Sequence, residues 1–89
     1  MAKKEFKIGE YAVGGIVEVL VEPNDNDSPG DEVTIKFCDF NTKKVIKDES
    51  FQSRQFGVKN KIQEFLWDNT SDYYADKIIE YINTQTVLN

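Results

Sequence analysis

Five acidic residues lie four positions apart in the last third of the chain, and carboxylates at such a spacing can attract a cationic surface. They are Glu64, Asp68, Asp72, Asp76 and Glu80. Residues four apart are neighbours on a helix surface, and each such step rises about 6 Å along the helix axis. That rise is close to twice the ~3.4 Å per phosphate on one strand of duplex DNA. The register therefore predicts a helical surface whose charges resemble those of a nucleic-acid backbone.

A turn interrupts this acidic series. The sequence Asn-Thr-Ser at 69–71 is turn and cap chemistry, and its Thr or Ser is suited to cap a second helix. Asp72 would then lie in the first turn, where the helix dipole favours a negative charge. Glu64 and Asp68 therefore belong to one predicted helix and the other three acids to the next. The sequence predicts two short acidic patches on either side of the turn.

Lys77 is the one basic residue in the sequence between Glu64 and Glu80 that could neutralise these acids. A solvated helix face usually interleaves lysines with its acids, because like charges four residues apart are mildly destabilising. A plain solvated face with a capping Asp is nevertheless the alternative. Trp67 and Tyr73 fall outside the predicted helical cores, near the turn. Exposed aromatic residues beside acids are expected of an interface hot spot. The alternative is that Trp67 packs internally against the end of the hairpin. The predicted partner-binding residues are Glu64, Trp67, Asp68, Asp72, Tyr73, Asp76 and Glu80.

The elements that position these residues follow from hydrophobic periodicity. Residues 4–51 alternate in the manner of strands, most clearly at Val33, Ile35 and Phe37. From residue 53 the period becomes helical, and helices are expected at about 54–68 and 71–84. Strands followed by helices predict a single α+β domain over residues 1–89, with a three- to four-stranded antiparallel meander and a helical hairpin on one sheet face. Whether residues 4–22 form one bent strand or two depends on the break at Gly14-Gly15.

A loop between two predicted strands holds a second acidic group. Its residues are Asp25, Asp27, Asp31 and Glu32. The order Asp25-x-Asp27 followed by Gly30 has a faint likeness to a calcium loop, but the final ligand position holds Lys36. A hairpin connection is the simplest interpretation, and a secondary acidic contact surface is the alternative.

The middle of the chain is basic and offers a rival function. Residues 1–35 carry eight acids and three lysines, residues 36–61 carry seven bases and three acids, and residues 62–89 carry five acids and one lysine. The basic side chains could contact nucleic acid, with Phe37 and Phe40 as stacking platforms. Phe37 alternates with core residues, however, and the whole chain has a net charge of −5. Direct nucleic-acid binding is therefore not expected.

Several function classes are disfavoured by composition. The chain contains no histidine and one cysteine, Cys38, so histidine-dependent nucleophile systems and zinc sites rich in His or Cys cannot be built. Neither a phosphate-binding loop nor a dinucleotide-binding glycine motif is present. We expect no enzyme, no cofactor and no metal site. No apolar run is long enough to span a membrane, Lys3 and Lys4 precede no signal-peptide core, and we expect a cytoplasmic protein.

The function expected from these patterns is that of a small acidic binding protein. Its partner would be a larger protein with a Lys/Arg-rich surface, and the sharpest form is a phage-type inhibitor that mimics nucleic acid. Such an inhibitor would occupy a basic nucleic-acid-binding site, for example on a CRISPR effector. The alternative is a homo-oligomeric structural or adaptor protein, for example a homodimer, in which the basic middle of one copy contacts the acidic helices of another.

Overall fold

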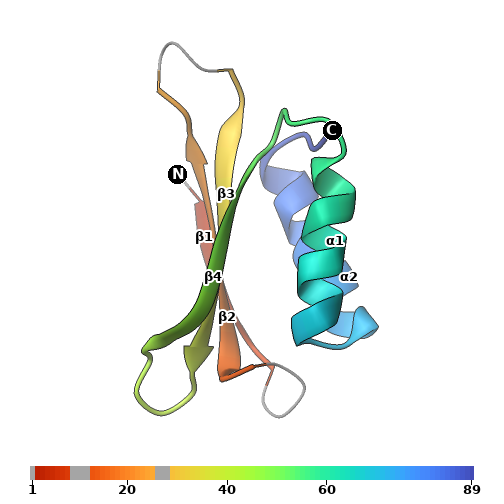
Figure 1. Ribbon diagram of the computed structural model, residues 1–89. Helices are drawn as coiled ribbons and strands as arrows, with labels where there is room; N and C mark the ends of the chain where they lie inside the picture. The colour runs from red at the N-terminus through yellow and green to blue at the C-terminus, as the bar shows by residue number, and fades with distance from the viewer. Residues whose placement is uncertain (1, 9–12, 26–28) are drawn as a thin grey trace.

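The computed structural model describes residues 2–8, 13–25 and 29–89. It contains a four-stranded antiparallel sheet followed by two helices that cover one face of the sheet (Figure 1). The strands are β1 (Ala2–Lys7), β2 (Gly15–Pro23), β3 (Asp31–Asp39) and β4 (Val45–Gln52), and the helices are α1 (Val58–Asn69) and α2 (Asp72–Gln85). The predicted α+β meander with a C-terminal helical hairpin is confirmed.

The described residues between positions 4 and 22 include two separate strands. β1 pairs with β2 from Ala2↔Val21 to Lys7↔Ile16, and β2 begins at Gly15. Gly14 and Gly15 both have positive φ, 78° and 93°, so the glycine pair turns the chain into the second strand. Tyr11, which the alternation would have placed in the first strand, lies outside the described residues.

The core lies between the helices and one sheet face. Val17, Val19 and Val21 of β2 alternate toward the helices, and Val33, Ile35 and Phe37 of β3 do the same. The helices contribute a buried apolar stripe at helical spacing, which comprises Val58, Ile62, Phe65, Leu66, Ala75, Ile78, Ile79 and Ile82. The strands at the two edges are more exposed than the central pair, and Phe51 is the buried residue of β4.

Helix α1 begins four residues later than the periodicity indicated. Residues 53–57 form turns, in which Gln55 N–H donates to Gln52 O and Val58 N–H donates to Gln55 O. Gly57 then precedes the helix in the left-handed conformation, with φ 76°. The apolar period alone could not show these turns before the helix. The second helix begins at Asp72, within one residue of the predicted start, and the Ser71 hydroxyl accepts from Tyr74 N–H.

The β3–β4 hairpin is closed by the side chain of Asp39. Its Oδ1 accepts from the backbone N–H groups of Asn41 and Thr42, both at 2.8 Å. These bonds, first that from Thr42, lower the pKa of Asp39. Because the folded pKa is lowered, the stability that the carboxylate contributes is present above the ordinary Asp pKa and is lost as the pH falls.

The connection from β4 to α1 is fixed by Ser53, which is buried. Ser53 Oγ accepts from Asp31 N–H at 2.8 Å, and Ser53 O accepts from Asn89 N–H at 3.1 Å.

We expect Ser53→Ala to lower the free energy of unfolding by about 1–2 kcal/mol, because the partly buried Asp31 N–H loses its acceptor. Ser50→Ala is the matched control, since its exposed hydroxyl bonds Thr34 Oγ1 at 3.1 Å. Urea titration should show a change within about 0.5 kcal/mol for that control. Equal effects of the two variants would contradict this role of Ser53.

Candidate functional site

Three of the predicted acids lie exposed along α2. Asp72, Asp76 and Glu80 all project from the helix, whose opposite side packs in the core. Lys77 interrupts them in sequence, but its Nζ lies 4.8 Å from the centre of the Tyr73 ring. Hydrogen bonding to Tyr73, with a smaller electrostatic effect, raises the pKa of Lys77. In the described residues no ion pair within 4 Å neutralises any of the three carboxylates. We call these three residues the α2 acidic surface.

The other two acids of the series lie elsewhere. Glu64 and Asp68 of α1 line a hollow of about 450 Å³ beside β4, together with Lys47 and Lys61. Glu80 instead borders a groove on the β1 side of α2. The structure therefore brings Glu64 and Asp68 together with two lysines and does not gather them with Glu80. Opposite charges in the same hollow reduce the field that these two acids present to a partner.

Two aromatic side chains are exposed near the turn between the helices. Trp67 is 48% exposed and Tyr73 is 62% exposed, in agreement with their absence from the helical core pattern. The ring of Tyr73 meets that of Tyr74 edge to face at 5.1 Å. The turn itself is anchored, because Val13 N–H donates to Asn69 O at 3.1 Å and the Asn69 side-chain amide donates to Phe65 O. The turn that joins the helices carrying Trp67 and Tyr73 is therefore held by two hydrogen bonds of Asn69.

The secondary acidic loop is divided by its local contacts. Asp31 accepts from the Thr86 hydroxyl, and so it ties β3 to the segment after α2. Glu32 accepts from the Gln52 amide at 3.5 Å, while Asp25 is exposed. Asp27 lies outside the described residues. Across the described ranges, no group of three or more His, Cys, Asp or Glu side chains is placed to hold a metal ion.

The basic middle does not supply a stacking platform at Phe37, which is completely buried beside Phe65. Phe40 is 53% exposed, in the turn after β3.

Cys38 lies on the face opposite the helices, as alternation predicts, yet it is buried. Burial, and secondarily Glu18, raises the pKa of its thiol. A raised pKa keeps the thiol protonated and weakly nucleophilic at neutral pH.

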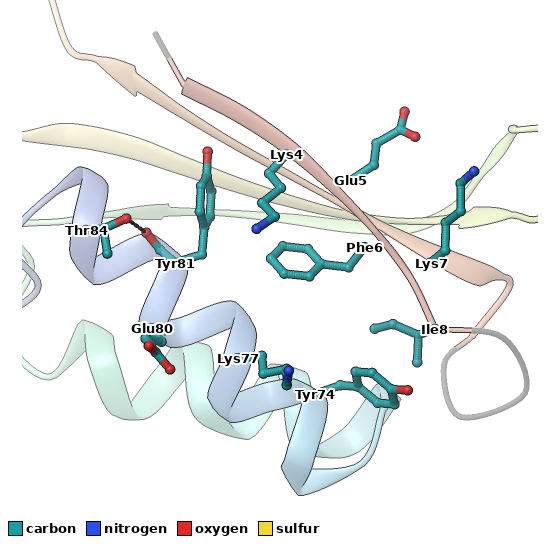
Figure 2. Close-up of a pocket in the computed structure, with 10 residues that line it drawn as sticks. All are labelled: Lys4, Glu5, Phe6, Lys7, Ile8, Tyr74, Lys77, Glu80, Tyr81 and Thr84. Atoms are coloured by element: carbon teal, nitrogen blue, oxygen red, sulfur yellow. Dashed lines mark hydrogen bonds between the residues drawn. The ribbon is translucent and has the colours of Figure 1, made fainter.

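Sequence reasoning missed a groove between β1 and α2. Figure 2 shows Lys4 and Phe6 of β1, and Ile8 just after it, pointing toward the helix, while Glu5 and Lys7 point away. The groove has a volume of about 650 Å³, and α2 contributes Tyr74, Lys77, Glu80, Tyr81 and Thr84 to it. The alternation of β1 was the available signal, but nothing in the sequence indicated which strand would lie beside the second helix. We call this feature the β1–α2 groove.

Comparison with family models, with curated proteins and with solved structures yields no match for this chain. Within the described part of the chain, neither helix is long and apolar enough to cross a membrane.

Proposed function

We propose that this chain is a non-enzymatic binding protein that docks the α2 acidic surface onto a Lys/Arg-rich nucleic-acid-binding site of a larger protein. By occupying that site it would act as an inhibitor and mimic of nucleic acid, in the manner of small phage inhibitors. The observation that supports the proposal is the exposed four-residue register of Asp72, Asp76 and Glu80, which no described basic side chain pairs within 4 Å.

The energetics of the helix favour a cationic partner. Like charges four residues apart each cost about 0.2–0.5 kcal/mol in an isolated helix. A basic surface removes that repulsion when it binds, and it attracts the acids before contact, so association is fast at low salt. Glu64 and Asp68 contribute less to this attraction, because Lys47 and Lys61 line the same hollow.

Trp67 and Tyr73 supply the apolar part of the contact. Exposed Trp and Tyr side chains beside charged residues are typical of interface hot spots. Both lie near the end of the helical hairpin from which the α2 acidic surface begins. Docking would therefore bury the aromatic pair and place the carboxylates along the basic site of the partner.

The test is capture of a partner by the immobilised protein from a lysate of cells that encode it, with a charge-reversal variant. The variant Asp72→Lys, Asp76→Lys, Glu80→Lys changes the net charge from −5 by six units to +1. We expect wild type to retain a nucleic-acid-binding protein that the variant does not retain, and added salt should release it. The matched control reverses three other exposed acids, Glu5, Asp48 and Glu49, and should retain the same protein. Retention by the α2 variant would refute the proposal.

Self-association is separated from foreign docking by sedimentation. A monomer at both low and high salt is expected if the α2 acidic surface serves a foreign partner. A dimer that dissociates in salt, and that the α2 charge reversal abolishes, would instead assign this surface to contacts between copies of the chain.

A further inference from the structure

The outer edge of β1 has backbone groups available for another strand. Ile8 N–H donates to Gly15 O at 2.9 Å, so Ile8 directs its backbone groups toward β2. Backbone direction alternates along an antiparallel ladder. The even-numbered residues of β1 therefore bond β2, and Lys3, Glu5 and Lys7 direct their N–H and C=O groups outward. In the part of the chain that the structure describes, β1 pairs with β2 alone.

Helix α2 supplies a wall beside this edge. Phe6 of β1 meets Tyr81 of α2 edge to face, with ring centres 5.9 Å apart. Both side chains are half-buried and line the β1–α2 groove with Tyr74 (Figure 2). A strand added outside β1 would direct every second side chain toward these rings. An exposed edge beside a side-chain groove is the arrangement in which proteins bind extended peptides by strand addition.

The groove also presents two lysines whose ammonium groups lie near aromatic rings. Lys4 Nζ lies 5.0 Å from the Phe6 ring centre and 5.3 Å from that of Tyr81, and Lys77 Nζ lies 4.8 Å from that of Tyr73. The single ion pair within 4 Å among the described residues is Lys3–Glu18, so neither lysine has a carboxylate at that distance, and Glu80 attracts Lys77 from farther away. A carboxylate in the groove would gain charge-assisted hydrogen bonds from them.

The charges along β1 also indicate whether its outer edge would pair with a second copy of the chain or with an acidic strand of another protein. A second copy paired through β1 would bring Lys3, Lys4 and Lys7 close to the same residues of its partner, and facing like charges destabilise a sheet. The groove beside β1 is lined by three lysines against Glu5 and Glu80, whereas the hollow beside β4, the opposite edge, is lined by two lysines against Glu49, Glu64 and Asp68. The β1 edge is therefore the one that favours an acidic strand.

We propose that the β1–α2 groove binds an extended acidic segment of another protein, which adds to the outer edge of β1 as a fifth strand. The segment bonds the outward backbone groups of β1, inserts apolar side chains against Phe6 and Tyr81, and places carboxylates at Lys4 and Lys77. This site shares Glu80 with the α2 acidic surface, but the contacts proposed for its ligand are the β1 edge, Phe6, Tyr81, Lys4 and Lys77.

The probe is a fluorescein-labelled peptide of about nine residues, long enough to span β1, in which Glu alternates with Val or Phe. Fluorescence anisotropy should show micromolar binding that weakens with salt. Lys77→Glu should weaken it by about tenfold. Glu5→Pro should abolish binding, because proline removes an outward N–H and leaves the ladder to β2 intact. Glu5→Ala is the matched control and should bind as wild type does, and circular dichroism verifies the fold of each variant.

Altered peptides test whether binding needs both the negative charge and the backbone pairing. A peptide with Lys in place of each Glu, and one N-methylated on alternate residues, should both fail to bind. The proposal is overturned if the acidic probe does not bind at about 1 mM, if the Lys peptide binds equally, or if folded Lys77→Glu protein binds without loss. It is also overturned if Glu5→Pro converts a wild-type dimer to a monomer, since a second copy would then occupy the edge. Lys77→Glu should not weaken partner capture through the α2 acidic surface, so the two proposals can fail separately.

Discussion

Gly14→Ala is expected to destabilise the protein much more than Gly57→Ala, although the two glycines have nearly the same backbone conformation. Their φ angles are 78° and 76°, so a side chain at either position costs about 1 kcal/mol of left-handed strain. A Cβ on Gly14 would also lie 2.4 Å from Cys38 O, whereas a Cβ on Gly57 meets nothing within 4 Å. Relieving that collision requires a backbone shift, which costs about a further 1–3 kcal/mol.

The expected total for Gly14→Ala is a large part of the stability of a domain of this size, about 4–13 kcal/mol. Urea titration followed by Trp67 fluorescence measures both variants against wild type, with the denaturant slope as a check on two-state behaviour. Equal losses at the two glycines would show that the close approach of Gly14 to β3 does not exist in solution.

Ile35→Ala is expected to lower the free energy of unfolding by about 3 kcal/mol, because it leaves a cavity in the closed core between sheet and helices. Ile35 is completely buried in β3. Its matched control is Ile46→Ala on the next strand, where the same atoms are removed from a side chain that is 53% exposed. We expect that control to lose less than about 1 kcal/mol.

Thermal and urea unfolding of the Ile35 and Ile46 variants measure the difference directly. A loss at Ile46 as large as that at Ile35 would mean that the face opposite the helices is covered in solution, for instance by another copy of the chain.

The fold was largely predictable because each element has a strong local pattern. The alternation of Val33, Ile35 and Phe37 predicted both the strand and its buried face. The sequence predicted Thr70 or Ser71 as the cap of α2, and Ser71 is the cap. The start of α1 was not predictable, since residues 53–57 form turns that are bonded to the ends of β3 and β4, through Ser53 N–H to Asp31 O and Gln55 N–H to Gln52 O. Apolar periodicity contains no information about those bonds.

The candidate site was only partly predictable for a related reason. Exposure of Asp72, Asp76 and Glu80 follows from helical periodicity, which is a local property. The association of Glu64 and Asp68 with Lys47 depends on which edge strand lies beside α1. The β1–α2 groove likewise joins residues more than 65 positions apart in the chain, Phe6 and Tyr74 among them. Contacts of this kind are set by tertiary packing and leave no periodic signal.

We propose that the α2 acidic surface occupies a nucleic-acid-binding site, and a competition assay tests this proposal without intermediate steps. The captured partner is loaded with labelled nucleic acid and titrated with each form of the chain. Wild type and the Glu5, Asp48, Glu49 reversal should displace the nucleic acid, and the Asp72, Asp76, Glu80 reversal should not. Failure of wild type to displace the nucleic acid, or equal displacement by the α2 reversal, would contradict the claim.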